Sequence, residues 1–255
     1  MRSIIYSGVE PPPLLRLIVN NYALDDINII ANNVHDYYVA GIRILHETDN
    51  VLLLLLRVKE GLRSHICQNV LEELGVKSSI PTPDAKIAVS LVREKFKNNN
   101  NFANVYRELC KEFQIKANLI PFTSGEISAK VKTEIGELSL LEYLLAKKEI
   151  KVQKVEFTGL DKVKPHEQVG SLIRGSESVL IMPNDPVSII PIIKNKTVQE
   201  AMKNCEGHVA VISPPITSRS VALLKALDIA PTPLGGAELF EGLVDTFIMD
   251  ISCQD

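Results

Sequence analysis

Two carboxylates and an amide follow an early apolar run at a spacing that would let them act together. Asn32 and Asp36 come after residues 27–31, and Asp49 follows thirteen positions after Asp36. Oxygen ligands of this kind could hold a magnesium–phosphate pair or accept a hydrogen bond from a substrate amide. The alternative is structural, because short polar side chains also serve in turns and as helix caps.

A second polar cluster, residues 217–220, stands before a predicted helix. Arg219 and its hydroxyl neighbours could bind an anion through the guanidinium, the hydroxyls and backbone N–H groups. A plain Ser/Thr cap with a solvated arginine explains the same residues equally well. His35 and His46 lack the company of other metal ligands, and we interpret them as surface residues. The chain contains no Walker loop, HExxH sequence or ordered Ser-His-Asp set.

Residues 179–191 indicate how such groups would be positioned. Four apolar residues predict a buried strand, Pro183 ends it, and Asn184 begins a polar turn before helix-compatible sequence. In open α/β sheets, ligands bind over strand ends of this kind, although an ordinary βα loop has the same pattern. We therefore expect one crevice to be surrounded by Ser7, Asn32, Asp36, Asp49, Asn184 and Ser213.

Strands and helices alternate at both ends of the chain, which predicts an α/β fold with a mostly parallel sheet. The predicted strands are residues 3–6, 27–31, 179–182, 209–212 and 246–249. Helices are predicted at residues 14–19, 48–58, 197–204 and 237–243, with another that ends near 227. Thr48 or Asp49 would cap the second helix, although its aliphatic run also permits a strand. Residues 197–200 have the pattern of a capping box.

The elements predicted in the middle of the chain do not alternate regularly between strand and helix. This part of the sequence predicts helices at residues 62–74, 84–97, 102–113 and 140–148 and strands at 117–120, 127–133 and 152–157, with a turn at 98–101. Asp84 would cap a helix whose apolar face is Ile87, Leu91 and Val92. We interpret residues 57–151 as an inserted, mainly helical subdomain. Residues 1–56 and 152–255 would form the core.

Composition narrows the class of protein. The chain has 255 residues, 45% of them hydrophobic and 23% charged, as in ordinary soluble domains. A net charge of −3 argues against nucleic-acid or acidic-membrane partners. Its four cysteines form no CxxC pair, which argues against a zinc site or disulfide framework. With no signal-type start and no apolar run long enough to span a bilayer, the sequence predicts a cytoplasmic protein.

Several segments, in order, resemble the 2-phospho-L-lactate transferase (CofD) family. PNDPVSIIPI at residues 183–192 resembles the family's PSNPxxSIxPIL, and VAVISP at 209–214 resembles VVAVSPI. VEFTG at 155–159, GGAE at 235–238 and DTFIMD at 245–250 also have family counterparts. Near the start, NNVHD at 32–36, Gly41 and TDNVL at 48–52 are similar to NTxxD, a following glycine and LDTVL. The resemblance covers nearly the whole chain.

The departures from the family pattern are concentrated in two motifs. The glycine-rich SGGTGTPKLL is SGVEPPPLL here, at residues 7–15, and GDRDxATH is PDAKIAVS, at 83–90. Glycines let backbone N–H groups approach phosphate, whereas three prolines supply no donor and Glu10 adds negative charge. Losing two charge-assisted hydrogen bonds of about 1.5–3 kcal/mol each would weaken binding on the order of a hundredfold. We expect weak nucleotide binding through this loop, and Ala85 and Ser90 replace the family's deazaflavin-contacting Arg and its His.

The resemblance implies a Rossmann-like core with an inserted helical subdomain, and it allows a homodimer. The family reaction, in coenzyme biosynthesis, transfers a phospholactyl group from lactyl-diphospho-guanosine to a deazaflavin hydroxyl, releasing GMP and using magnesium. It would make Asp36 and Asp49 catalytic residues and magnesium ligands. The expected partner, a small phosphorylated ligand or a nucleotide, would meet Ser7, Gly8, Asn32, Asp49, Asn184, Ser188, Ser213 and Arg219.

A second branch of the superfamily resembles gluconeogenesis factors, which are non-catalytic regulators that bind nucleotide sugars. The replaced glycine-rich loop favours this regulatory alternative. Asp49 and the Asn32–Asp36 pair favour the enzyme. The sequence leaves both functions open.

Overall fold

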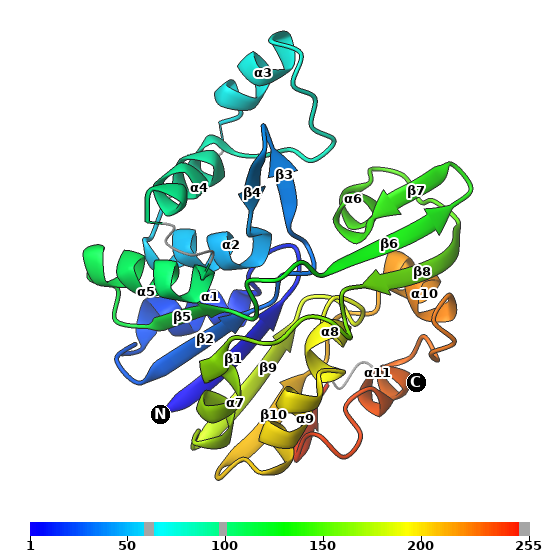
Figure 1. Ribbon diagram of the computed structural model, residues 1–255. Helices are drawn as coiled ribbons and strands as arrows, with labels where there is room; N and C mark the ends of the chain where they lie inside the picture. Colours follow the sequence, from blue (N-terminus) through cyan, green and yellow to red (C-terminus); the bar gives the residue numbers. More distant parts are fainter. Residues whose placement is uncertain (59–63, 97–100, 250–255) are drawn as a thin grey trace.

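The computed structural model describes residues 1–58, 64–96 and 101–249, and its centre is a six-stranded parallel sheet (Figure 1). The strand order is β11-β10-β9-β1-β2-β5, and every neighbouring pair is parallel. The strands are β1 (Arg2–Ser7), β2 (Ile27–Ala31), β5 (Asn118–Pro121), β9 (Ser178–Pro183), β10 (His208–Ile212) and β11 (Thr246–Ile248). The predicted α/β fold with a mostly parallel sheet is confirmed.

Successive side chains along the strands pack alternately into two separate hydrophobic cores. Ile4 and Tyr6 of β1 pack into one hydrophobic cluster, and Ile5 packs into the other. This is the expected result when successive strand side chains point to opposite faces. The helices packed on the first face are α1 (Pro13–Asn21), α2 (His46–Leu55) and α5 (Phe102–Glu112). Those on the second are α7 (Glu167–Arg174), α8 (Ile190–Ile193), α9 (Lys196–Lys203), α10 (Ser218–Lys225) and α11 (Pro233–Glu238).

The remaining elements gather beyond the carboxyl ends of the central strands (Figure 1). One group holds an antiparallel hairpin, β3 (Tyr37–Val39) and β4 (Ile42–Ile44), with α3 (Ile66–Glu73) and α4 (Asp84–Phe96). The other is an antiparallel sheet of β6 (Ser128–Thr133), β7 (Gly136–Ser139) and β8 (Val152–Thr158), with α6 (Leu140–Leu145). Strand β5 corrects one expectation, because it lies within the predicted insert yet forms the edge of the central sheet. The division at residues 57 and 151 stays a prediction.

Helix α4 buries a face that apolar periodicity does not predict. Of the three predicted apolar positions only Ile87 is buried, whereas Leu91 and Val92 are 53% and 38% exposed. The buried polar side chains of α4 are Lys86, Ser90 and Arg93. Their burial is explained below by the partners they meet.

Three helix boundaries also differ from the predictions. Helix α9 is capped by Asn195, whose Oδ1 accepts from the N–H groups of Thr197 and Val198, so the capping box at 197–200 is wrong. Helix α2 begins at His46, which puts Thr48 and Asp49 inside its first turn. Helix α11 ends at Glu238, near the start of the helix predicted at 237–243. Parts of three predicted elements lie outside the described part of the chain. They are residues 62–63 of the helix predicted at 62–74, residue 97 of the helix predicted at 84–97, and residues 98–100 of the turn predicted at 98–101.

Across the described ranges, no helix combines the length and apolarity needed to cross a membrane.

Candidate functional site

Several predicted site residues meet at the carboxyl ends of β1, β2 and β9. The Ser7 carbonyl accepts from the Asn184 N–H at 2.7 Å, and the Asn32 amide donates to Ser7 Oγ at 3.0 Å. The same amide donates to the Ser188 carbonyl at 2.6 Å. Gly8 has a φ of +140°, and a Cβ added there would lie 2.3 Å from the Asn184 Cβ. These residues therefore lie together at the carboxyl edge of the sheet, as expected, and their polar atoms bond mainly to one another.

A buried network beside them includes a histidine that we expected at the surface. Ser188 Oγ donates to Asp185 and lies 2.8 Å from His35 Nε2, so His35 donates through Nε2–H. Its other ring nitrogen, Nδ1, has no hydrogen-bond partner in the described chain. Burial, with Lys86 nearby, lowers the His35 pKa to about 3. The surface interpretation of His35 and His46 is therefore wrong, since their exposed fractions are 1% and 5%.

Asp36 is held by an arginine on β4. Its Oδ2 accepts from Arg43 Nε at 3.1 Å and Nη2 at 2.8 Å, and from the Asn33 amide at 3.2 Å. Its Oδ1 accepts from the His46 backbone N–H at 3.1 Å. Burial raises the Asp36 pKa to about 6, against the lowering effect of Arg43. At pH 7 Asp36 is thus a carboxylate whose lone pairs already have partners.

Asp49 is enclosed still more completely, and it explains the polar face of α4. Both of its oxygens accept from Arg93 Nη1 at 2.7 Å, and neither side chain is exposed. Tyr106, Ser90 and the Leu45 N–H also donate to this carboxylate. Arg93 and Arg43 are linked in turn, because Arg93 Nη2 donates to the Arg43 carbonyl. Both guanidinium carbons lie over the Phe102 ring, 5.7 and 5.4 Å from its centroid.

These carboxylates do not fit the role of magnesium ligands that the resemblance implies. A hard cation needs six or more oxygen or water ligands, whereas the oxygens of Asp36 and Asp49 face arginine donors. No group of three His, Cys, Asp or Glu residues arranged to hold a metal occurs in the described part of the chain. The catalytic and metal-binding roles stay predictions.

Ser213 and Arg219 are not joined to this cluster by any contact in the described ranges. Ser213 Oγ donates to the Pro214 carbonyl at 3.3 Å, and Arg219 Nη2 donates to the Ala146 carbonyl at the end of α6. Thr217 caps α10 by accepting from the Ser220 N–H at 3.2 Å. The plain Ser/Thr cap describes residues 217–220 better than the anion site does.

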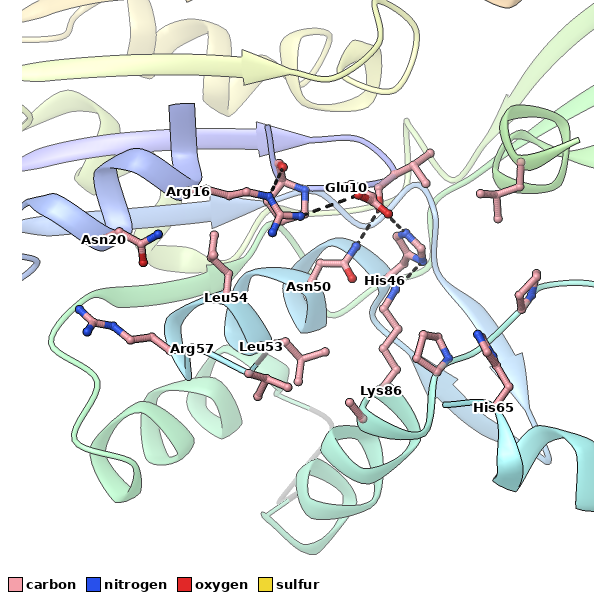
Figure 2. Close-up of a pocket in the computed structure, with 17 residues that line it drawn as sticks. Glu10, Arg16, Asn20, His46, Asn50, Leu53, Leu54, Arg57, His65 and Lys86 are labelled. Atoms are coloured by element: carbon pink, nitrogen blue, oxygen red, sulfur yellow. Dashed lines mark hydrogen bonds and ion pairs between the residues drawn. The ribbon is translucent and has the colours of Figure 1, made fainter. Parts of the chain in front are cut away.

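The main hollow, which we call the cationic pocket, has a volume of about 630 Å³. The loop after β1, which we call the first loop (residues 8–12), forms one wall, and α1, α2 and the start of α4 form the others (Figure 2). Among the described lining residues, Arg16, Arg57 and Lys86 are cations and Glu10 is the acid. Glu10 lies 3.8 Å from Arg16. The lining therefore favours a negatively charged ligand.

Four consecutive carbonyls of the first loop are held by side chains. Tyr6 donates to the Gly8 carbonyl at 2.7 Å, and the Asn184 amide donates to that of Glu10 at 3.1 Å. His46 Nε2 and Asn50 Nδ2 each donate to the Val9 carbonyl at 2.8 Å. Arg16 Nε donates to the Pro11 carbonyl at 3.2 Å. The loop is thus fixed through its acceptors, whereas a glycine-rich phosphate loop works through its donors.

Sequence reasoning missed the pocket cations and Asn50. Arg16 lies on α1, Asn50 on α2 and Arg57 just after α2, but nothing in their spacing marks them as functional. Lys86 did carry a signal, since it stands at the family's second Asp in GDRDxATH. A lysine at this position reverses the sign of the local charge.

Comparison with known proteins assigns the chain to a family. The family model described as "2-phospho-L-lactate transferase CofD" matches residues 12–253. The 2-phospho-L-lactate transferase of Methanosarcina mazei is 25% identical over 97% of this chain and 86% of its own length. That of Methanospirillum hungatei is 26% identical over 98% and 89%.

A solved structure supports the fold independently. A protein member of the UPF0052 family from Bacillus halodurans superposes with a TM-score of 0.64 at 17% identity, covering 97% of this chain and 80% of that one. At this identity the likeness concerns the fold alone. The family model matches nearly all of the described residues, and on this match the chain belongs to the 2-phospho-L-lactate transferase CofD family.

Proposed function

We propose that this protein is a CofD-type transferase that holds a phosphorylated nucleotide-type donor in the cationic pocket. The reaction would be that of the family, transfer of a phospholactyl group from lactyl-diphospho-guanosine to a deazaflavin hydroxyl with release of GMP. The observation that carries the proposal is the charge of the pocket, where three cations face one carboxylate among the described lining residues. Relatives named 2-phospho-L-lactate transferase across the full chain length support the same reaction.

The pocket cations would act by compensating charge on the phosphates. Arg57 is exposed at the end of α2, and its guanidinium has no partner among the described residues. Arg16 is shared with Glu10 and the Pro11 carbonyl. Fixed cations stabilise negative charge on a transferring phosphoryl group without reorganising, which is the main contribution proteins make to such reactions. Magnesium stays a proposal from the resemblance, and no step is assigned to it here.

A second function is favoured by one specific observation, the first loop. Pro11, Pro12 and Pro13 offer no N–H, and the carbonyls of residues 8–11 are already bonded to side chains. Such a loop can shape a pocket but supplies few donors to a diphosphate. A non-catalytic protein that binds nucleotides or nucleotide sugars would need the cationic pocket and no turnover.

One pair of experiments separates the two functions. Calorimetry with guanosine diphosphate, with and without magnesium, measures binding. Incubation with lactyl-diphospho-guanosine and deazaflavin measures the phospholactyl product. We expect binding that weakens on Arg57→Gln but not on Arg219→Gln, the matched control outside the pocket lining, together with slow product formation.

Binding without product would favour the regulatory function. Absence of both binding and product would overturn the proposal. Equal affinities for wild type and Arg57→Gln would show that the donor binds elsewhere.

A further inference from the structure

The cationic pocket has two chemically distinct ends. Figure 2 shows Arg57 and Asn20 at one end, and Lys86, His46 and His65 at the other. Side chains of α2, including Leu53 and Leu54, lie between them. A ligand that reached both ends would therefore carry its polar groups apart and pack its middle against α2.

Lys86 is a buried ammonium, and three of its acidic neighbours pair with arginines. Asp36 and Asp49 are each bonded to an arginine, and Glu10 lies 3.8 Å from Arg16. Lys86 is 5% exposed, and among the described residues no carboxylate lies within ion-pair distance of its Nζ.

The hydrogen-bond partner of Lys86 is His46 Nδ1, at 2.9 Å. Because His46 must donate from Nε2 to the Val9 carbonyl, its Nδ1 is an acceptor and takes one lysine N–H. Two N–H groups of Lys86 remain for a ligand.

An unpaired charge this deeply buried is costly, and a ligand anion would remove the cost. Of the described lining residues, Ala85 precedes Lys86 in the chain and His65 lies at the same end of the pocket, and neither is a lysine or an arginine. One ammonium with two free N–H groups matches the single charge and paired oxygens of a carboxylate. A phosphate dianion fits better beside a guanidinium, which the Arg57 end offers. The Arg16 guanidinium lies beside Glu10 instead (Figure 2).

We propose that Lys86 is a specificity-determining residue that binds a carboxylate, so that the pocket selects a ligand carrying a phosphate at one end and a carboxylate at the other. This inference rests on the proposed function, because it assumes that the Arg57 end holds phosphate. The proposed donor already carries a carboxylate and phosphates, and the inference adds the residue that recognises the carboxylate.

Two matched probes test the inference on the full-length protein. 6-Phosphogluconate and sorbitol 6-phosphate are both linear six-carbon phosphates, and they differ in a carboxylate against a hydroxymethyl group. Calorimetry at pH 7 should show the carboxylate probe binding about 10- to 100-fold more tightly, as one charge-assisted hydrogen-bonded pair contributes. Lys86→Met should bring both probes to the same affinity, whereas Arg57→Gln should weaken both by a similar factor.

A pH profile of the wild type provides a second readout that needs no variant. Burial lowers the Lys86 pKa to about 8, so the ammonium is present below that pH and lost above it. The preference should therefore fall between pH 7 and pH 9.5. Burial keeps the pKa of His46 well below its usual range, so this ring stays neutral throughout. The other charged groups that face Lys86 are Glu10, Asp36, Glu47 and Asp49.

Each outcome decides something. Equal affinities in the wild type, or a preference that survives Lys86→Met and alkaline pH, would overturn the inference. Binding of guanosine diphosphate with no binding of either probe would also overturn it, while leaving the proposed function intact. Failure of all three ligands to bind would remove the proposed function together with the inference.

Discussion

Replacing Asp49 by asparagine separates a structural role for this residue from a role in ligand binding. The substitution keeps the shape of the side chain but leaves the fully buried Arg93 without a counter-charge. Removing one partner of a buried ion pair costs about 3–5 kcal/mol. Against a typical total stability of roughly 5–15 kcal/mol, this is a large loss. We expect a clear fall in the denaturant midpoint, with the slope unchanged.

The assay is equilibrium urea unfolding in a double-mutant cycle. Arg93→Met should be as harmful as Asp49→Asn, and the double variant should lose less than the two single losses added together, since no unpaired charge remains. Asp25→Asn is the control, because the Asp25–Lys116 pair is 63% and 70% exposed and should contribute less than about 1 kcal/mol.

One result would refute the reasoning. If Asp49→Asn unfolds within about 1 kcal/mol of wild type and instead abolishes ligand binding or turnover, then Asp49 contacts the ligand. That is the role the family resemblance implies, and the buried ion pair would then be incidental to stability.

Three further predictions concern His35, Gly8 and Arg57. The His35 pKa is about 3 in the fold against an ordinary 6.5, so the unfolded chain takes up a proton that the folded chain refuses; through His35, lowering the pH from 7 to 5 should cost about 2 kcal/mol of unfolding free energy. His35→Gln should remove this share and leave that of the buried His46, whereas the exposed His208→Gln should leave both. Gly8→Ala should lose about 2–4 kcal/mol, because its methyl meets Asn184, and Gly41→Ala, with open space around it, about 1–2 kcal/mol; equal losses in chemical denaturation would argue against the close contact. Arg57→Gly should raise stability by roughly 0.5–1 kcal/mol, since Arg57 has a φ of +53°, while weakening guanosine diphosphate binding; a loss of stability would contradict this.

The centre of the sheet was predictable because β1, β2 and β9 are largely buried and stand in short apolar runs between turn residues. Residues 27–31 coincide with β2, and Pro183 ends β9 as its missing N–H requires. The meeting of Ser7, Asn32 and Asn184 followed from the same rule, since the carboxyl ends of parallel strands share one edge.

The parts that sequence could not predict depend on partners far apart in the chain. Helix α4 turns Arg93 inward, away from the exposed Leu91, because Asp49 lies forty-four positions earlier in the chain and needs a cation. The spacing of apolar residues along a helix carries no information about such a partner. In the same way Asp84, expected to cap α4, accepts from the Cys67 N–H at 2.9 Å and so caps α3 instead.

The two buried ion pairs also bear on how sequences of this fold can change. One pair joins Asp36 to Arg43 and the other joins Asp49 to Arg93. The guanidinium groups of both arginines lie over the Phe102 ring, and Arg93 donates a hydrogen bond to the Arg43 carbonyl. A lineage that loses one member passes through an unstable intermediate, so viable descendants change both members of a pair or neither. The start of α4 is under no such constraint, because among the described residues Lys86 forms no ion pair and bonds to the neutral His46 ring. Ligand preference can therefore change by single substitutions at the start of α4, while Arg93 in its last turn keeps its pairing with Asp49.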